Sequence, residues 1–156
     1  RWGRSAKTKA VSVRDEAGRA DGMGEYEYDE ADRCGKHAAQ QVGLREEQVV
    51  KTLGTRGDKT GLRVFCIPVS DELDLRRAAS VSGNKKLEMI HVKELLPLTG
   101  YIRGGCSPIG MKKKYPTYID ETSILFDEIA VSAGMRGEQI ILAPDDLAKF
   151  VDAKVY

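Results

Sequence analysis

One lysine and one glycine-rich stretch are the residues of this sequence whose types and spacing best fit chemistry. Lys51 interrupts the β-branched run from Val49 to Leu53, and the stretch from Thr99 to Tyr115 has four glycines within eleven residues. Loops of this density can aim several backbone N–H groups at one developing anion or phosphate. A solvent-facing strand lysine and a plain glycine-rich connection give the same patterns. Evidence that Lys51 and the glycine-rich stretch form a functional site must therefore come from the rest of the chain.

Small hydroxyl side chains and a lysine cluster extend this set. A lysine, loop amides and hydroxyls can together bind and polarise an ester carbonyl without a protein nucleophile. Lysines that directly follow the loop can hold phosphate groups, although a solvated loop has the same composition. The hydroxyls are those of Thr52, Ser107 and Ser132, and the cluster consists of Lys112, Lys113 and Lys114.

Several common active sites are missing from the sequence. The only histidines, His37 and His91, lie near no serine, and no GxSxG, Rossmann or P-loop pattern occurs. No carboxylate pair among the 24 acidic residues is singled out by its spacing. The three cysteines, Cys34, Cys66 and Cys106, form no CxxC pair. We therefore expect no metal, and a reducing, cytoplasmic compartment.

Length and composition indicate one soluble globular domain. The chain has 156 residues, of which 41% are hydrophobic and 31% charged, enough for a core of its own. The net charge is only +1, so a nucleic-acid partner must be met by a local basic patch. No apolar run approaches the length of a membrane span, and no apolar segment follows the basic N-terminus. We expect neither a transmembrane helix nor a secretory signal.

Hydrophobic alternation predicts short strands that are joined mainly as hairpins. One hairpin turns at Gly57-Asp58 and its second strand ends at Pro68; another turns across residues 134–137. The predicted strands, about seven, are residues 26–28, 49–53, 62–67, 86–90, 116–120, 128–132 and 139–143.

Short helices are predicted around these strands. Ser70 or Asp71 caps a helix that Gly83 closes, and the helix at 92–96 is expected to end before Pro97. The other helical segments are residues 6–17, 35–42, 121–126 and 144–150. Strands that cluster as hairpins favour a single-domain α+β fold around a mixed, mainly antiparallel, barrel-like sheet.

Four motifs occur in one order along the chain. They are Gln48–Leu53, Leu73–Arg77, Thr99–Lys114 and Asp146–Lys149. Together they resemble the YbaK/EbsC family of aminoacyl-tRNA deacylases, from about Glu25 to Lys154, and the Val-Lys-Thr strand and the loop are the most specific. Residues 1–24 lack the apolar helix and strand of that family. We therefore expect a poorly defined N-terminal segment at 1–24 and a YbaK-like editing domain at 25–156, all within one domain.

The resemblance implies a trans-editing enzyme that removes a wrong amino acid, chiefly cysteine, from tRNA for proline, without metal or organic cofactor. It also implies a substrate-assisted reaction: the cysteinyl thiolate attacks its own ester carbonyl, releases the terminal ribose hydroxyl and leaves a cyclic thiolactone. A net charge near zero predicts weak binding of RNA alone, so prolyl-tRNA synthetase is a further expected partner, which would deliver the tRNA.

Three alternatives stay open at this point. The first is a deacylase for Ala-tRNA(Pro) or another small aminoacyl-tRNA that uses water as the nucleophile. The second is a non-catalytic module that binds tRNA or a synthetase. The third is a small-molecule binder with no RNA role, against which salt-sensitive tRNA binding would count.

The resemblance also assigns residues. The essential lysine falls on Lys51, and two positions depart from the family: Cys34 stands for a phenylalanine and Gln139 for an aspartate. Both departures are expected to influence which aminoacyl group is accepted. The expected substrate-binding residues are Tyr26, Cys34, Thr52, Gly104, Gly105, Cys106, Ser107, Pro108, Ser132 and Gln139. The lysine cluster itself, rather than the resemblance, predicts tRNA phosphate contacts at Lys112, Lys113 and Lys114.

Overall fold

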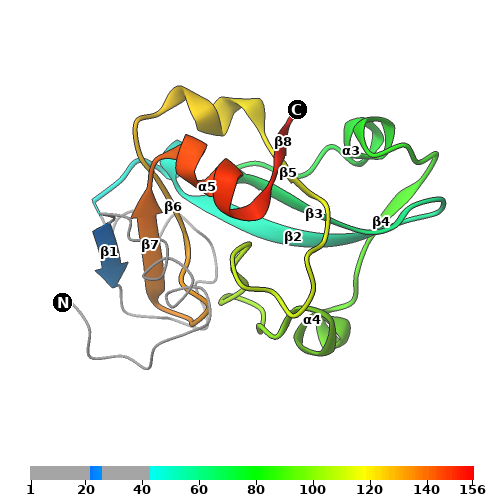
Figure 1. Cartoon of the computed structure of the whole chain (residues 1–156), viewed down its shortest axis with the longest axis horizontal. Coiled ribbons are helices and arrows are strands. Elements are labelled where there is room, and N and C mark those ends of the chain that lie inside the picture. The colour runs from blue at the N-terminus through cyan, green and yellow to red at the C-terminus, as the bar shows by residue number, and fades with distance from the viewer. Residues whose placement is uncertain (1–21, 26–42) are drawn as a thin grey trace.

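The strands form two sheets in the structure, a computed structural model that describes residues 22–25 and 43–156 (Figure 1). The smaller sheet has the order β1 (Gly22–Glu25), β7 (Glu138–Leu142), β6 (Ile129–Ser132), and all its pairs are antiparallel. The larger has the order β4 (Leu87–Met89), β2 (Val50–Gly57), β3 (Gly61–Pro68), β5 (Thr117–Ile119), β8 (Lys154–Val155). In the larger sheet, β5 runs parallel to both β3 and β8.

This arrangement confirms an α+β fold with a mixed, mainly antiparallel set of strands. The expectation of about seven strands in a barrel-like sheet was wrong, because the described residues contain eight strands in two sheets and no closed barrel. The short strand β8 gave no sequence signal, since two residues are too few to show alternation. The strand predicted at 26–28 and the helices predicted at 6–17 and 35–42 lie outside the described residues.

The β2–β3 hairpin is confirmed and is the longest pairing in the described part of the fold. Its register runs from Val50 opposite Pro68 to Gly57 opposite Gly61. Gly61 has φ +76°, which a three-residue hairpin connection requires. The side chain of Asn84 accepts hydrogen bonds from the turn amides of Lys59 (2.9 Å) and Thr60 (3.0 Å). The turn is thus held from outside by a buried amide.

A parallel bridge between Val49 and Ala130 joins the two sheets, so that β2 and β6 lie alongside each other. Successive strand residues point to opposite faces, and the packing identifies both faces. The inner face carries the main core, which includes Val50, Cys66, Val131, Ile140 and the loop residue Ile109. The outer face carries a smaller cluster of Val49, Ala130, Leu44, Val69 and Ile141.

Two helices differ from their predicted limits. Helix α3 (Leu75–Val81) begins later than expected, because Asp74, not Ser70 or Asp71, caps it by accepting from the amides of Arg76 and Arg77, each at 3.1 Å. Helix α4 (Val92–Thr99) continues through Pro97. The missing proline N–H removes one helical hydrogen bond, but the helix still closes at Gly100, whose N–H donates to the Leu96 carbonyl and whose φ is +87°.

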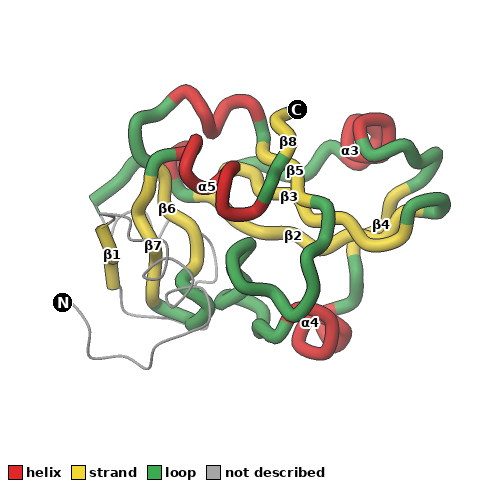
Figure 2. The backbone as a smooth tube through the Cα atoms, in the orientation of Figure 1, coloured by secondary structure: helices red, strands yellow, loops and turns green. Residues whose placement is uncertain are grey.

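The remaining predicted helical segments are confirmed where the structure describes them. Helix α5 (Pro144–Val151) starts with proline and two acidic residues, and η2 (Glu121–Leu125) is one 3-10 segment. The structure adds a second 3-10 turn, η1 (Glu46–Gln48), just before β2. Between α4 and β5 the chain has no helix or strand (Figure 2), and this loop carries the glycine-rich motif.

Candidate functional site

Lys51, Ser132 and Gln139 share the outer face where the two sheets meet. Lys51 has the same orientation as Val49 two residues earlier, and Ser132 has the same orientation as Ala130. Lys51 and Ser132 each lie two residues beyond the parallel Val49–Ala130 bridge, on strands that are in contact. Ser132 is in turn directly opposite Gln139 in the β6–β7 ladder. The three residues therefore face the same side of three neighbouring strands, and we call them the polar row.

The two neutral members of this row have different environments. The Ser132 hydroxyl accepts a hydrogen bond from the Gly134 N–H at 3.1 Å, which fixes its position at the end of β6. Gln139 is 6% exposed, and its Oε1 atom has no hydrogen-bond partner among the described residues. A buried amide oxygen without a partner costs free energy unless a ligand or water satisfies it. Gln139 is therefore able to take a hydrogen bond from a bound group.

Thr52 is next to Lys51 in sequence but lies on the inner face. It is directly opposite Cys66, a member of the main core. The Thr52 hydroxyl is buried and has no hydrogen-bond partner of good geometry among the described residues. Lys51 and Thr52 thus face different sides of the sheet, as strand alternation requires.

The glycine-rich loop contacts the turn that follows Ser132. A Cβ placed on Gly105 would lie 3.1 Å from the Arg136 nitrogen and 3.1 Å from the Met135 carbonyl carbon, so only glycine allows this backbone approach without a shift. The Arg136 Nε also donates to the Arg103 carbonyl at 3.0 Å. The loop segment 103–105 is therefore docked at the end of β6, close to the polar row.

Hydrogen bonds inside the loop determine which of its amides are free. The Gly105 N–H donates to the Ile102 carbonyl at 3.0 Å, and the Ile109 N–H donates to the Ser107 hydroxyl at 3.2 Å. Ser107 is fully buried, and Pro108 has no N–H to offer. Among the described residues, the N–H groups of Gly104 and Cys106 donate to no acceptor. Gly104 is exposed and Cys106 half-buried, so these two amides are available to a ligand.

The thiols of the described residues are not activated. Burial raises the pKa of Cys106 to about 11 and that of Cys66 to about 12. Both are therefore protonated at neutral pH, and the thiol is a far weaker nucleophile than the thiolate. Neither cysteine fits the role of a protein nucleophile.

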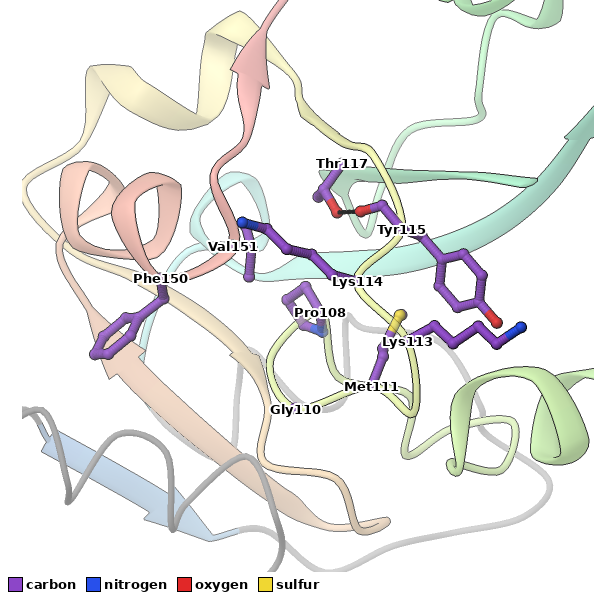
Figure 3. Close-up of a pocket in the computed structure, with 9 residues that line it drawn as sticks. All are labelled: Pro108, Gly110, Met111, Lys113, Lys114, Tyr115, Thr117, Phe150 and Val151. Carbon is purple, nitrogen blue, oxygen red and sulfur yellow. Dashed lines mark hydrogen bonds between the residues drawn. The ribbon is translucent and has the colours of Figure 1, made fainter. Parts of the chain in front are cut away.

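The three lysines after the loop do not act as one group. The alkyl stem of Lys112 lies along Gly100, where an added Cβ would be 3.3 Å from Lys112 Cγ. Lys113 and Lys114 instead line a cavity of about 240 Å³ between the loop and α5 (Figure 3). The other lining residues are Pro108, Gly110, Met111, Tyr115, Thr117, Phe150 and Val151. This cavity does not include Lys51.

The structure therefore brings part of the predicted site together. Lys51, Ser132 and Gln139 form the polar row, and Gly104 and Gly105 dock beside its end. Thr52, Cys106, Ser107 and Pro108 are packed behind the row or within the loop. Tyr26 and Cys34 lie outside the described residues. Sequence reasoning missed Arg136 and Met135, and the only available signal was that the turn across 134–137 adjoins Ser132.

The part of the chain that the structure describes contains neither a metal-binding group of side chains nor a membrane-spanning helix. In residues 22–25 and 43–156, no three His, Cys, Asp or Glu side chains are grouped so that they could hold a metal ion. None of the helices in that part of the chain is long and apolar enough to cross a membrane.

Comparisons with known proteins agree with the motifs and the geometry. The model of the aminoacyl-tRNA editing domain family matches residues 30–150. EbsC of Enterococcus faecalis, whose name describes a candidate Cys-tRNA(Pro)/Cys-tRNA(Cys) deacylase, is 47% identical over 130 residues, which cover 83% of this chain and 79% of that protein.

Solved structures extend this agreement to the fold. The crystal structure of a candidate trans-editing enzyme for prolyl tRNA synthetase is 28% identical, covers 97% of both chains and superposes with a TM-score of 0.83. A hypothetical protein at 21% identity, with a TM-score of 0.84 over 95% of this chain and 97% of its own, supports the fold alone. The resemblance expected from the four motifs is confirmed, and the chain belongs to the aminoacyl-tRNA editing domain family.

Proposed function

We propose that this chain is a trans-editing aminoacyl-tRNA deacylase whose substrate is cysteinyl-tRNA for proline. Membership of the aminoacyl-tRNA editing domain family supports the reaction class. The deacylase name of the 47% identical relative supports the cysteinyl group, and the solved structure related to prolyl tRNA synthetase supports action in trans. The substrate is thus argued from relatives, and the residues below from the geometry.

The observation that carries the proposal is that Lys51 and Ser132 face the same side of neighbouring strands, and that the glycine-rich loop docks on the turn after β6. An ester that enters here meets an ammonium group on one side and loop amides on the other. Lys51 positions the terminal adenosine or the ester by charge and hydrogen bonding. The free N–H groups of Gly104 and Cys106 hold the oxyanion that forms on the carbonyl.

The nucleophile in this proposal is the thiolate of the substrate. Its sulfur forms a bond to the ester carbonyl carbon, and the carbonyl oxygen becomes the oxyanion. When the oxyanion collapses, the bond to the ribose oxygen breaks, the ribose oxygen takes up a proton, and the cysteine leaves as a cyclic thiolactone. The raised pKa values of Cys106 and Cys66, about 11 and 12, are consistent with this route, because neither of these two described cysteines supplies a competing thiolate at neutral pH.

A panel of charged tRNAs tests the activity. Release of the amino acid is measured from Cys-tRNA(Pro), Ser-tRNA(Pro), Ala-tRNA(Pro) and Pro-tRNA(Pro). We expect rapid release of cysteine only, because serine has the shape of cysteine but its hydroxyl is not ionised at neutral pH. Release of alanine and serine at the rate of cysteine would favour water as the nucleophile. No release from any of these tRNAs would mean a non-catalytic binding module.

Delivery by prolyl-tRNA synthetase, in the cytoplasm, completes the proposal. The net charge of +1 supports it, because the chain as a whole has little long-range attraction for RNA. A pull-down of Cys-tRNA(Pro) by this chain, with and without the synthetase, tests the point. We expect more tRNA to be recovered when the synthetase is present, and equal recovery would contradict delivery.

A further inference from the structure

The cavity between the glycine-rich loop and α5 has no role in the ester chemistry proposed above. We infer that it binds a nucleotide of an unpaired RNA 3′ strand, the strand whose end carries the aminoacyl ester. The identity of the RNA rests on the proposed function, but the residues differ from those of the ester site. The inference concerns Lys113 and Lys114 and the apolar surface between them.

The shape and lining of the cavity fit one nucleotide. Its volume is about 240 Å³, and Pro108, Met111 and Val151 give it an apolar surface. In Figure 3, Lys114 extends toward Val151 while Lys113 runs in the opposite direction, alongside Tyr115, with Pro108 and Met111 between them. An apolar surface suits the face of a base, and flanking ammonium groups suit the phosphates on either side of it.

The charges of the cavity are available to a ligand. Lys114 Nζ lies 3.7 Å from Asp152 Oδ2, but the two side chains are 73% and 83% exposed, so the pair is weak and easily exchanged. Lys113 makes no ion pair with the described residues and is exposed. Since the chain carries a net charge of only +1, two such lysines on one cavity form a local patch of the kind that RNA binding requires.

The loop is the covalent connection between this cavity and the ester site. Gly105 is docked at the end of β6, and Lys113 follows eight residues later. Eight residues span at most about 29 Å even when fully extended. The cavity is therefore close enough to be reached by an RNA strand whose end lies at the ester site. A cavity that takes one base also favours a splayed, unpaired nucleotide over a duplex, whose bases are stacked and paired.

Hydrogen bonds hold this part of the loop in place before any ligand binds. The Tyr115 hydroxyl donates to the Leu98 carbonyl at 2.6 Å, and the Lys112 N–H donates to the Thr99 carbonyl at 3.0 Å. Gly110, at φ +74°, turns the chain between the apolar floor and the lysines. The lysines are thus carried on a preformed loop, which reduces the ordering cost of binding.

Binding of an uncharged RNA minihelix tests the inference without any need for catalysis. The probe is a fluorescent hairpin with the single-stranded 3′ end of tRNA for proline, and a blunt-ended hairpin of the same stem is the comparison. The variant is K113Q/K114Q, and the matched control is K85Q/K86Q, which removes the same charge beside β4 at the far end of the β2–β3 hairpin. Thermal melts confirm that both variants are folded.

We expect K113Q/K114Q to bind the single-stranded probe about tenfold or more weakly, while K85Q/K86Q binds as the parent chain does. The slope of log affinity against log salt should fall by about 1.4 in K113Q/K114Q, which is about 0.7 for each lost contact with a single strand. An unchanged slope in this variant would overturn the inference, as would equal binding of the blunt hairpin by the parent chain.

The outcome of this RNA-binding test can be distinguished from the outcome of the deacylation panel that tests the proposed function. Binding that depends on Lys113, Lys114 and the single-stranded end would support the inference even if the tRNA panel showed no deacylation. Deacylation with binding that is indifferent to both lysines would support the proposed function and overturn the inference.

Discussion

Gly105 lies so close to Arg136 that a Cβ on the glycine would be 3.1 Å from the Arg136 nitrogen. The contact joins the glycine-rich loop to the turn after β6, and the Arg136 Nε strengthens it by donating to the Arg103 carbonyl. Ser132 ends the strand before this turn, and Lys51 faces the same side of the neighbouring strand, so we expect the contact to influence the distance between the loop amides and the lysine.

Substitution of Gly105 by alanine tests this contact. The added methyl meets backbone atoms of Met135 and Arg136, which cannot rotate away, so we expect the loop to shift by a few tenths of an ångström. Deacylation should fall by about tenfold, because small misplacements of a catalytic group are costly. The free energy of unfolding should fall by about 1–3 kcal/mol.

Gly54→Ala is the control for that variant. Its Cβ would lie 2.7 Å from Ile90 Cδ1, the far end of a flexible side chain that can adopt another rotamer. We expect Gly54→Ala to keep its activity per folded molecule. An active Gly105→Ala protein, or an inactive but folded Gly54→Ala protein, would contradict the role given to the loop contact.

The position of Gln139 predicts an effect on the choice of aminoacyl group. Gln139 is buried on the same face as Lys51. In Gln139→Asp a carboxylate would repel the cysteinyl thiolate and could activate water instead. We expect kcat/KM for Cys-tRNA(Pro) to fall about tenfold, which corresponds to about 1.4 kcal/mol, while release of alanine stays the same or rises.

Gln139→Asn separates the charge from the change in length, because asparagine is as short as aspartate but neutral. Rates on Cys-tRNA(Pro) and Ala-tRNA(Pro) are compared for both variants. If Gln139→Asp leaves the ratio of the two rates at its original value, Gln139 does not take part in choosing the aminoacyl group.

Cys66 predicts how stability changes in alkaline solution. Burial raises the pKa of this thiol to about 12 in the folded protein, against an unfolded value near 9. The folded chain therefore holds this proton where the unfolded chain has lost it. The contribution of the protonated Cys66 thiol to the free energy of unfolding is fully present below pH 9. It is lost as the pH rises toward 12, at about 1.4 kcal/mol per pH unit for this one group.

The Cys66→Ala variant isolates this contribution. Urea unfolding is followed at pH 7, 9 and 10.5 for both proteins. We expect the variant to be less stable at pH 7, because a core residue has been shortened, and its stability to fall less steeply above pH 9. Parallel losses in the two proteins above pH 9 would show that Cys66 does not titrate as its burial requires.

The sequence predicts the local elements of this fold better than their assembly. The β2–β3 and β6–β7 hairpins and α5 were predicted because alternation, turn glycines and an N-terminal proline are local signals. The division into two sheets was not, and the Val49–Ala130 bridge that joins the sheets connects residues 81 positions apart. Helix α4 continues past Pro97 and closes at Gly100, although the proline is a local signal for an earlier end.

The candidate site shows the same limit. Lys51 and the loop could be selected from their residue types, and Thr52 could have been placed on the opposite face from Lys51 by strand alternation alone. Three consecutive lysines in a sequence do not show that their side chains will separate. In the structure Lys112 lies along Gly100, whereas Lys113 and Lys114 line a cavity. The contact of Gly105 with Arg136 is also tertiary, and no spacing in the sequence indicates it.

The most direct test of the account is the rate at which Lys51→Ala releases cysteine from Cys-tRNA(Pro). Lys59→Ala, which removes an exposed lysine in the turn of the β2–β3 hairpin, is the control, and thermal melts confirm that both variants are folded. We predict that Lys51→Ala loses at least about 100-fold in rate, the typical cost of removing one stabilising donor, and that Lys59→Ala is unaffected. A folded Lys51→Ala protein with full activity would contradict the account.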